Sequence, residues 1–142
     1  MSIQSPDTDI VIEVQLHDDQ EQRSGTIINV ASALALRGLH PSHIGYDVAK
    51  GCVCGMTRAL ALQLAPAGVR VNAIAQSSTL TEATRETGED DAELYRSHPM
   101  GRAAEPDEVA GAIAFLASGW STYCTGETLI ITGGQFIGST QI

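Results

Sequence analysis

The chain has 142 residues, of which 43% are hydrophobic and 18% charged, a balance typical of one globular domain with a core of its own. The formal net charge is −9, and an acidic surface repels phosphate backbones and anionic lipids, which argues against nucleic acid and membrane surfaces as partners. Aromatic residues amount to only 4%, so small and β-branched residues must fill the core, as in tightly packed α/β layers.

The chain carries no sign of a membrane or secretory destination. No apolar run approaches the roughly 18 residues that a spanning helix requires. Residues 1–7 lack the basic region and the apolar core of a signal peptide, so we expect a cytoplasmic protein.

Cysteine and histidine spacing predicts no metal site. Cys52 and Cys54 stand two residues apart and Cys124 is isolated, which argues against a disulfide framework and against a zinc site. His40 and His43 fall in a predicted loop without a third ligand nearby, and we expect them to be ordinary loop residues.

The N-terminal part contains two apolar stretches rich in β-branched residues. Residues 9–16 are compatible with a strand, although a helix fits their pattern too. Residues 26–31 suit a short, buried parallel strand.

The middle of the chain passes from a helical pattern to a strand and then to a polar stretch. Residues 46–64 are rich in Ala, Leu and Met and predict a helix, which Pro66 ends. Residues 69–75 predict a second buried strand. Residues 76–100 are polar, with a short helix expected near 90–97.

The C-terminal part predicts one more helix and one more strand. Pro106 suits the first turn of a helix over residues 106–118, and residues 128–131 predict the last strand. We expect Trp120 and Tyr123 to pack near that strand. Strand, helix, strand, helix and strand in this order predict an α/β fold with a parallel sheet.

Tyr46 and Lys50 are the candidate proton-transfer pair, because residues four apart on a helix project from one face. A free tyrosine has a pKa of about 10 and is a poor base at neutral pH. A neighbouring ammonium group stabilises the phenolate, so the pair can work as a general acid and base. Ser32 follows the predicted strand, and ligands of open α/β sheets bind beyond the carboxyl ends of strands. Taken alone, Tyr-x-x-x-Lys also fits a surface pair without a catalytic role.

Further motifs surround this pair in a fixed order. They are SGTIINVAS (24–32), YDVAK (46–50), GMTRALA (55–61), AGVRVNAI (67–74), GR (101–102), EPDEVA (105–110), FLAS (115–118) and TGE (125–127). Together they resemble the second half of the short-chain dehydrogenase/reductase family, over about residues 24–138.

The resemblance implies a Rossmann-like sheet and an NAD- or NADP-dependent oxidoreductase acting on a small-molecule alcohol or carbonyl. Within it, Tyr46 would transfer the proton, Lys50 would lower the pKa of Tyr46 and bind the nicotinamide ribose, and Ser32 would orient the substrate oxygen. Thr79 and Thr81 stand where the family contacts the carboxamide and phosphate of the cofactor.

The chain also departs from the family pattern. No two of its glycines stand two residues apart, so neither Gly-x-x-x-Gly-x-Gly nor Gly-x-Gly-x-x-Gly occurs. These two motifs form the loops that bind the phosphates of a dinucleotide. The Asn-Asn-Ala-Gly segment and the helix with a catalytic asparagine are missing, and Gln76-Ser77 replaces the usual Pro-Gly. We therefore predict a doubly wound parallel sheet truncated at its N-terminal side. Residues 24–142 form the catalytic half-domain, and residues 1–23 lie outside the family pattern.

Three hypotheses follow for the function. In the first, the chain is an oxidoreductase that is impaired or inactive alone because the dinucleotide-binding half is missing. In the second, it is a non-catalytic subunit, which forms a homo-oligomer or pairs with a full-length relative through residues 46–64. In the third, it is a truncated gene product. In each case the strand 26–31 has an open edge, which residues 9–16 could cap as a strand or helix.

Overall fold

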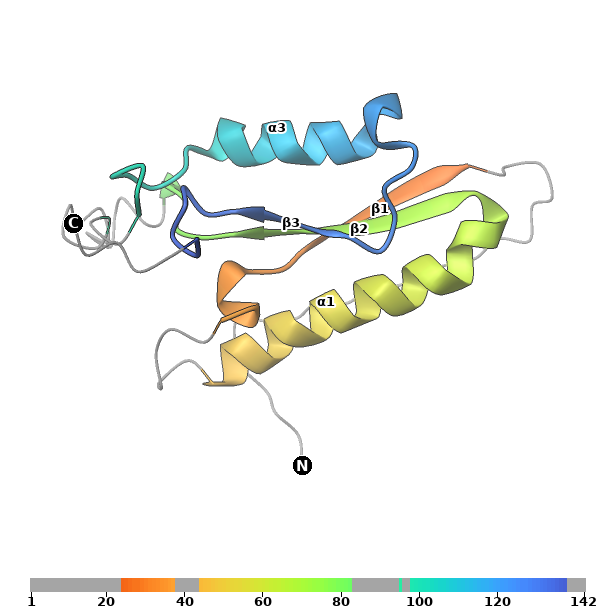
Figure 1. Ribbon diagram of the computed structural model, residues 1–142, viewed down its shortest axis with the longest axis horizontal. Helices are drawn as coiled ribbons and strands as arrows, with labels where there is room; N and C mark the ends of the chain where they lie inside the picture. Colours follow the sequence, from red (N-terminus) through yellow and green to blue (C-terminus); the bar gives the residue numbers. More distant parts are fainter. Residues whose placement is uncertain (1–23, 38–43, 83–94, 96–97, 138–142) are drawn as a thin grey trace.

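A computed structural model describes residues 24–37, 44–82, 95 and 98–137 (Figure 1). Three parallel strands form one sheet in the order β1-β2-β3, and a long helix lies in each of the two connections. The strands are β1 (Gly25–Val30), β2 (Val69–Gln76) and β3 (Thr128–Ile131), the helices are α1 (Ile44–Leu64) and α3 (Pro106–Ala117), and short 3-10 turns are η1 (Ala33–Ala35), η3 (Ala65–Ala67) and η5 (Gly119–Ser121).

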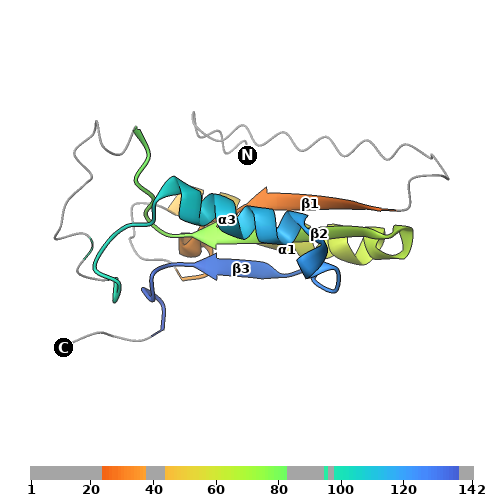
Figure 2. The same cartoon turned by 90° about the horizontal axis from the view of Figure 1, so that it is seen from above.

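The two helices cover opposite faces of the sheet, so the molecule has three layers (Figures 1 and 2). On the α1 face, Val71 packs against Ala61 and Leu64 of α1. On the α3 face, Ile74 packs against Val109 and Leu116 of α3. Strand β2 is therefore buried on both sides, which explains why its sequence is apolar without strict alternation.

Buried polar side chains tie the layers together. Asn29 of β1 donates through Nδ2 to Thr57 Oγ1 of α1 at 2.9 Å. Asn72 of β2, fully buried, donates to Cys124 O at 2.8 Å and accepts from Glu127 N at 3.1 Å. These bonds satisfy groups whose burial without a partner would be costly.

The expected strands over 26–31, 69–75 and 128–131 and the helices over 46–64 and 106–118 are confirmed, with bounds that differ from the sequence predictions by at most two residues. The parallel sheet is confirmed as well. The expectation for Trp120 and Tyr123 was wrong: both side chains are almost fully exposed. At this turn Ser121 is the buried residue, because its Oγ donates to Leu116 O at 2.9 Å.

Some expectations fall outside the described residues. These are the strand or helix over 9–16, the short helix near 90–97, and the loop histidines His40 and His43. Within the described residues, no helix is long and apolar enough to cross a membrane. The same residues contain no cluster of three side chains able to hold a metal ion.

Candidate active site

The carboxyl ends of the three parallel strands meet at one end of the sheet, and polar residues follow each of them. Ser32 follows β1, Ser77 follows β2 and Thr132 follows β3. Backbone bonds hold these ends side by side, from Ala31 N to Ile74 O at 2.8 Å and from Ser77 N to Ile131 O at 3.0 Å. This is the edge at which ligands of open α/β sheets bind.

Lys50 connects α1 to the end of β1. Its Nζ donates to Val30 O, the last carbonyl of β1, at 3.1 Å. The same Nζ lies 5.7 Å from the centre of the Tyr46 ring, so the ammonium group and the phenol are neighbours. Tyr46 is 41% exposed, so the residue is not enclosed by the fold.

Ser32 is brought to the same region by η1. It is only 6% exposed, and its Oγ accepts a hydrogen bond from Leu34 N at 3.2 Å as the N-cap of η1. η1 packs against α1 directly after Lys50, since a Cβ on Gly51 would lie 3.9 Å from Ala35 O. Ser32, Lys50 and Tyr46 thus share the end of β1 and the first turns of α1.

Thr79 and Thr81 lie on the segment that leaves β2. Thr79 forms a parallel bridge with Ala104, and its Oγ1 donates to Ser77 O at 3.3 Å. Thr81 N donates to Thr79 O at 2.9 Å, which makes a tight turn. These threonines are held mainly from the α3 side, whereas Tyr46 and Lys50 belong to α1.

Two buried acceptors near this edge have no hydrogen-bond partner among the described residues: Asp47 Oδ1 in the first turn of α1 and Gln76 Oε1 at the end of β2. Buried acceptors without partners are uncommon in folded proteins, and a bound water, an ion or a ligand can satisfy them. The nicotinamide end of a dinucleotide offers suitable donors, namely ribose hydroxyls and a carboxamide. These residues therefore fit that end of the cofactor, whereas the sequence supplies no glycine-rich loop for its phosphates.

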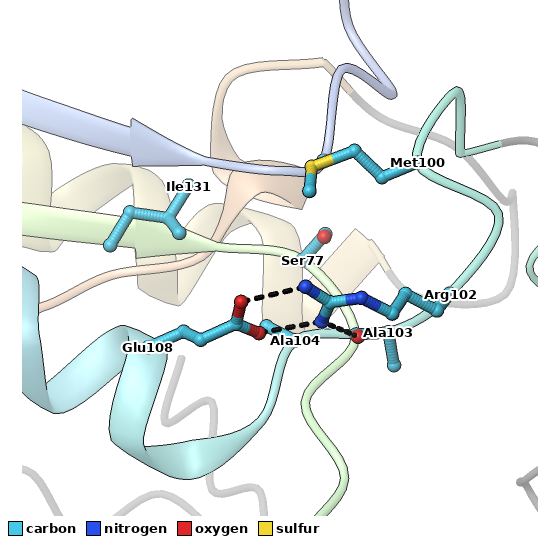
Figure 3. Close-up of a pocket in the computed structure, with 8 residues that line it drawn as sticks. Ser77, Met100, Arg102, Ala103, Ala104, Glu108 and Ile131 are labelled. Atoms are coloured by element: carbon cyan, nitrogen blue, oxygen red, sulfur yellow. Dashed lines mark hydrogen bonds and ion pairs between the residues drawn. The ribbon is translucent and has the colours of Figure 1, made fainter.

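A pocket of about 80 Å³ opens between the ends of β2 and β3 and the start of α3 (Figure 3). Met100, Ala104 and Ile131 give it a mainly apolar lining, and Ser77 contributes a hydroxyl. At its side, the Arg102 guanidinium and the Glu108 carboxylate make two bonds of 2.6 and 2.7 Å (Figure 3).

The ion pair fixes the start of α3. The hydrogen bonds from Arg102, together with one from Glu105 N, lower the pKa of Glu108 to about 2. Glu108 is therefore ionised at neutral pH and accepts from Glu105 N at 2.9 Å, which satisfies a donor of the first turn.

His98 is buried next to the pocket, with 3% of its surface exposed. Its Nε2 lies 3.3 Å from Ser77 Oγ, and the Tyr95 ring meets it edge-on with centres 6.0 Å apart. Burial lowers the pKa of His98 below its ordinary value of 6.5, so the neutral imidazole is favoured.

Sequence reasoning gave His98 no role and treated Gln76-Ser77 only as a departure from the family pattern. The available signal was positional: Gln76 and Ser77 are polar residues directly after a buried parallel strand, where a fold of this class binds its ligands. The partner of Ser77 stands 21 residues away, and no periodicity links the two.

Comparisons with known proteins agree with this geometry. The family model described as enoyl-(acyl carrier protein) reductase matches residues 13–135. The 3-oxoacyl-[acyl-carrier-protein] reductase of Aquifex aeolicus is 35% identical over 130 residues, which cover 91% of this chain and 52% of that protein. The 3-alpha-(or 20-beta)-hydroxysteroid dehydrogenase of Mycobacterium bovis is 39% identical over 119 residues, which cover 84% of this chain and 44% of that protein.

Solved structures also match most of this chain and about half of their own length. The structure of ElxO with NADP bound has a TM-score of 0.75 to this chain at 32% identity, and the match covers 82% of this chain and 48% of that one. The chain spans about half the length of the curated relatives it matches. Because the family model covers well over half of the chain and the parallel α/β sheet agrees, the chain belongs to the short-chain dehydrogenase/reductase family.

Proposed function

We propose that the chain supplies the proton-transfer half of an NAD- or NADP-dependent oxidoreductase that interconverts an alcohol and a carbonyl. The observation that carries the proposal is the position of Lys50 Nζ, bonded to Val30 O at 3.1 Å and 5.7 Å from the Tyr46 ring centre. A lysine held there keeps a positive charge beside a phenol that the fold does not enclose. Tyr46 then gives its proton to a carbonyl oxygen in reduction and takes one from a hydroxyl in oxidation.

Each residue has a separate task in this proposal. Lys50 holds its ammonium group beside the Tyr46 ring, 5.7 Å from the ring centre. Ser32 orients the substrate oxygen: its Oγ serves as the acceptor for Leu34 N, so its hydroxyl hydrogen can be donated to the substrate. The nicotinamide dinucleotide, when bound, supplies or accepts the hydride. Tyr46, Lys50, Thr79 and Thr81 would hold it.

We further propose that these 142 residues by themselves bind the dinucleotide weakly. They contain no glycine-rich phosphate loop, and their net charge of −9 opposes an anionic ligand. Activity by the chain alone is then impaired, because hydride transfer requires the cofactor to be held in register with Tyr46. The relatives are named for substrates as different as a 3-oxoacyl-[acyl-carrier-protein] and a hydroxysteroid, so the proposal extends only to the alcohol or carbonyl group.

Titration of the chain with NADPH and with NADH, followed by cofactor fluorescence, tests the proposal. We expect weak but saturable binding that Lys50→Ala weakens by at least about tenfold, the effect of losing a charge-assisted hydrogen bond. Arg58→Ala is the matched control, because it removes one positive charge from the exposed side of the same helix. Absence of saturation in the unmodified chain, or equal losses in both variants, would overturn the proposal.

A second candidate function is that of a non-catalytic subunit, and the outer face of α1 favours it. Ile44, Val48 and Leu62 recur at helical spacing and are 67%, 53% and 83% exposed. Apolar side chains gathered on one exposed face are typical of an interaction surface. We propose that this face pairs with a second copy of the chain or with a full-length relative.

Sedimentation of the chain measures this second candidate directly. We expect a dimer that Val48→Glu dissociates, because the new carboxylate would have to be buried in the interface. Ala114→Glu adds the same charge to the exposed side of α3 and should leave the dimer intact. A monomer at all concentrations, with cofactor binding retained, would leave only the oxidoreductase proposal.

A further inference from the structure

The segment that contains Tyr95 and His98 is fastened to the ends of two strands. On the β2 side, His98 Nε2 lies 3.3 Å from Ser77 Oγ. On the β3 side, Met100 N donates to Gly133 O at 3.1 Å. A turn closed by Gly101 N and His98 O at 2.8 Å links the two attachments.

Close packing leaves this turn little room. A Cβ placed on Gly134 would lie 2.9 Å from Pro99 Cγ, so Pro99 rests directly on the backbone after β3. A Cβ on Gly133 would lie 3.5 Å from Met100 Cβ. The backbone after β3 therefore limits the turn from one side, and on the β2 side the turn is held where Ser77 Oγ contacts His98 Nε2.

The turn also forms a wall of the pocket. Met100 lines it opposite Ala104 and Ile131, and Ser77 lines it from the end of β2 (Figure 3). Ser77 is thus shared between the pocket and the His98 contact. A change in the His98 contact would move Met100 relative to the rest of the lining.

We infer that Ser77 and His98 are positioning residues, whose hydrogen bond sets the place of Met100 and with it the shape of a pocket for a small, mainly apolar ligand group. Most of the exposed lining is apolar, from Met100, Ala103, Ala104 and Ile131, while Ser77 and the Arg102–Glu108 pair add polar groups to it. About 80 Å³ admits only two or three groups the size of a water molecule. The inference concerns the folded chain without cofactor. Its test is therefore independent of the test of the proposed function.

A double-mutant cycle read by amide hydrogen exchange tests the pair. Ser77→Ala removes the hydroxyl, and His98→Phe removes the ring nitrogens while keeping a ring against Tyr95. We expect each to speed exchange of the Met100 and Gly101 amides about fivefold relative to the Ala73 amide, as for the loss of one hydrogen bond. The double variant should change the exchange ratio by clearly less than the product of the two single changes, because the bond between Ser77 and His98 can be lost only once.

Two further variants separate positioning from general weakening of the fold. Ser78→Ala is the matched control for the neighbouring serine and should change the exchange ratio less than about twofold. Ser77→Thr retains the hydroxyl and should restore the Met100 methyl carbon signal that Ser77→Ala shifts. Three results would each overturn the inference. The first is that the two single changes in the exchange ratio multiply in the double variant, and the second is that Ser78→Ala changes the ratio as much as Ser77→Ala does. The third is that the folded Ser77→Thr variant does not restore the Met100 signal. If Ser77→Ala does not fold, the other two variants still test the inference: His98→Phe should speed exchange of the Met100 and Gly101 amides, and Ser77→Thr should leave it unchanged.

Discussion

At the scale of single residues, the end of β2 concentrates polar groups that the core does not require. Gln76 Oε1 is buried without a partner in the part of the chain that the structure describes, Ser77 faces a pocket, and His98 is buried beside it. Polar groups in such places cost stability unless they bind something. Ser77 and His98 offset this cost by contacting each other at 3.3 Å, whereas Gln76 Oε1 has no such compensation among the described residues.

The burial of His98 makes stability depend on pH. Its pKa is lowered in the folded state, so below its ordinary value of 6.5 the unfolded chain binds more protons than the folded chain. We expect the contribution of His98 to the free energy of unfolding to be fully present well above pH 6.5 and to decrease as the pH falls through and below that value. Urea titrations at several pH values measure this.

The variant His98→Phe should flatten that profile, although it starts from a lower stability because the bond to Ser77 is lost. The other three histidines contribute equally to both profiles, so the difference isolates His98. An unchanged slope in His98→Phe would show that the titration belongs to another group.

At the scale of elements, the turn after β3 depends on glycine. Gly134 has a φ of +86° and lies against Pro99, so a side chain there meets both backbone strain and a steric clash. Gly111 lies in the exposed face of α3 with open space around it, and there glycine only weakens the helix.

Alanine at these two positions should have opposite effects. We expect Gly134→Ala to lower the free energy of unfolding by about 1–3 kcal/mol. Gly111→Ala should raise it by about 0.5–1 kcal/mol. Denaturant unfolding of both variants measures the sign of each change in the free energy of unfolding. No change in Gly134→Ala would mean that the turn can rearrange to accommodate a side chain.

The elements themselves could be predicted because their signals are local. A run such as Thr26–Ala31 or Val69–Ala75 shows its buried strand within a few residues, and Tyr46 and Lys50 share a helix face by spacing alone. The contact between Ser77 and His98 could not be predicted, since it depends on how two loops meet across the strand ends.

At the scale of the whole molecule, the described part of the sheet ends at β1, which pairs with β2 along one side only. Since Ala31 N bonds to Ile74 O, the pleat directs the amides of Ile27 and Asn29 to β2 and those of Ile28 and Val30 to the other side. We expect the second pair to exchange hydrogen at least about tenfold faster than the first. Hydrogen exchange followed by NMR resolves this alternation, and uniform protection along β1 would instead indicate a neighbour on the open side.

Lys50 is the only lysine in the 142 residues, and its Nζ lies at the candidate active site. An amine-selective acylating reagent can therefore modify the α-amino terminus and this one side chain. The extent of labelling at Lys50, read by mass spectrometry of the peptide that contains it, reports whether a compound occupies the site. Candidate ligands can therefore be ranked by how strongly each protects Lys50 from acylation, before any substrate is known.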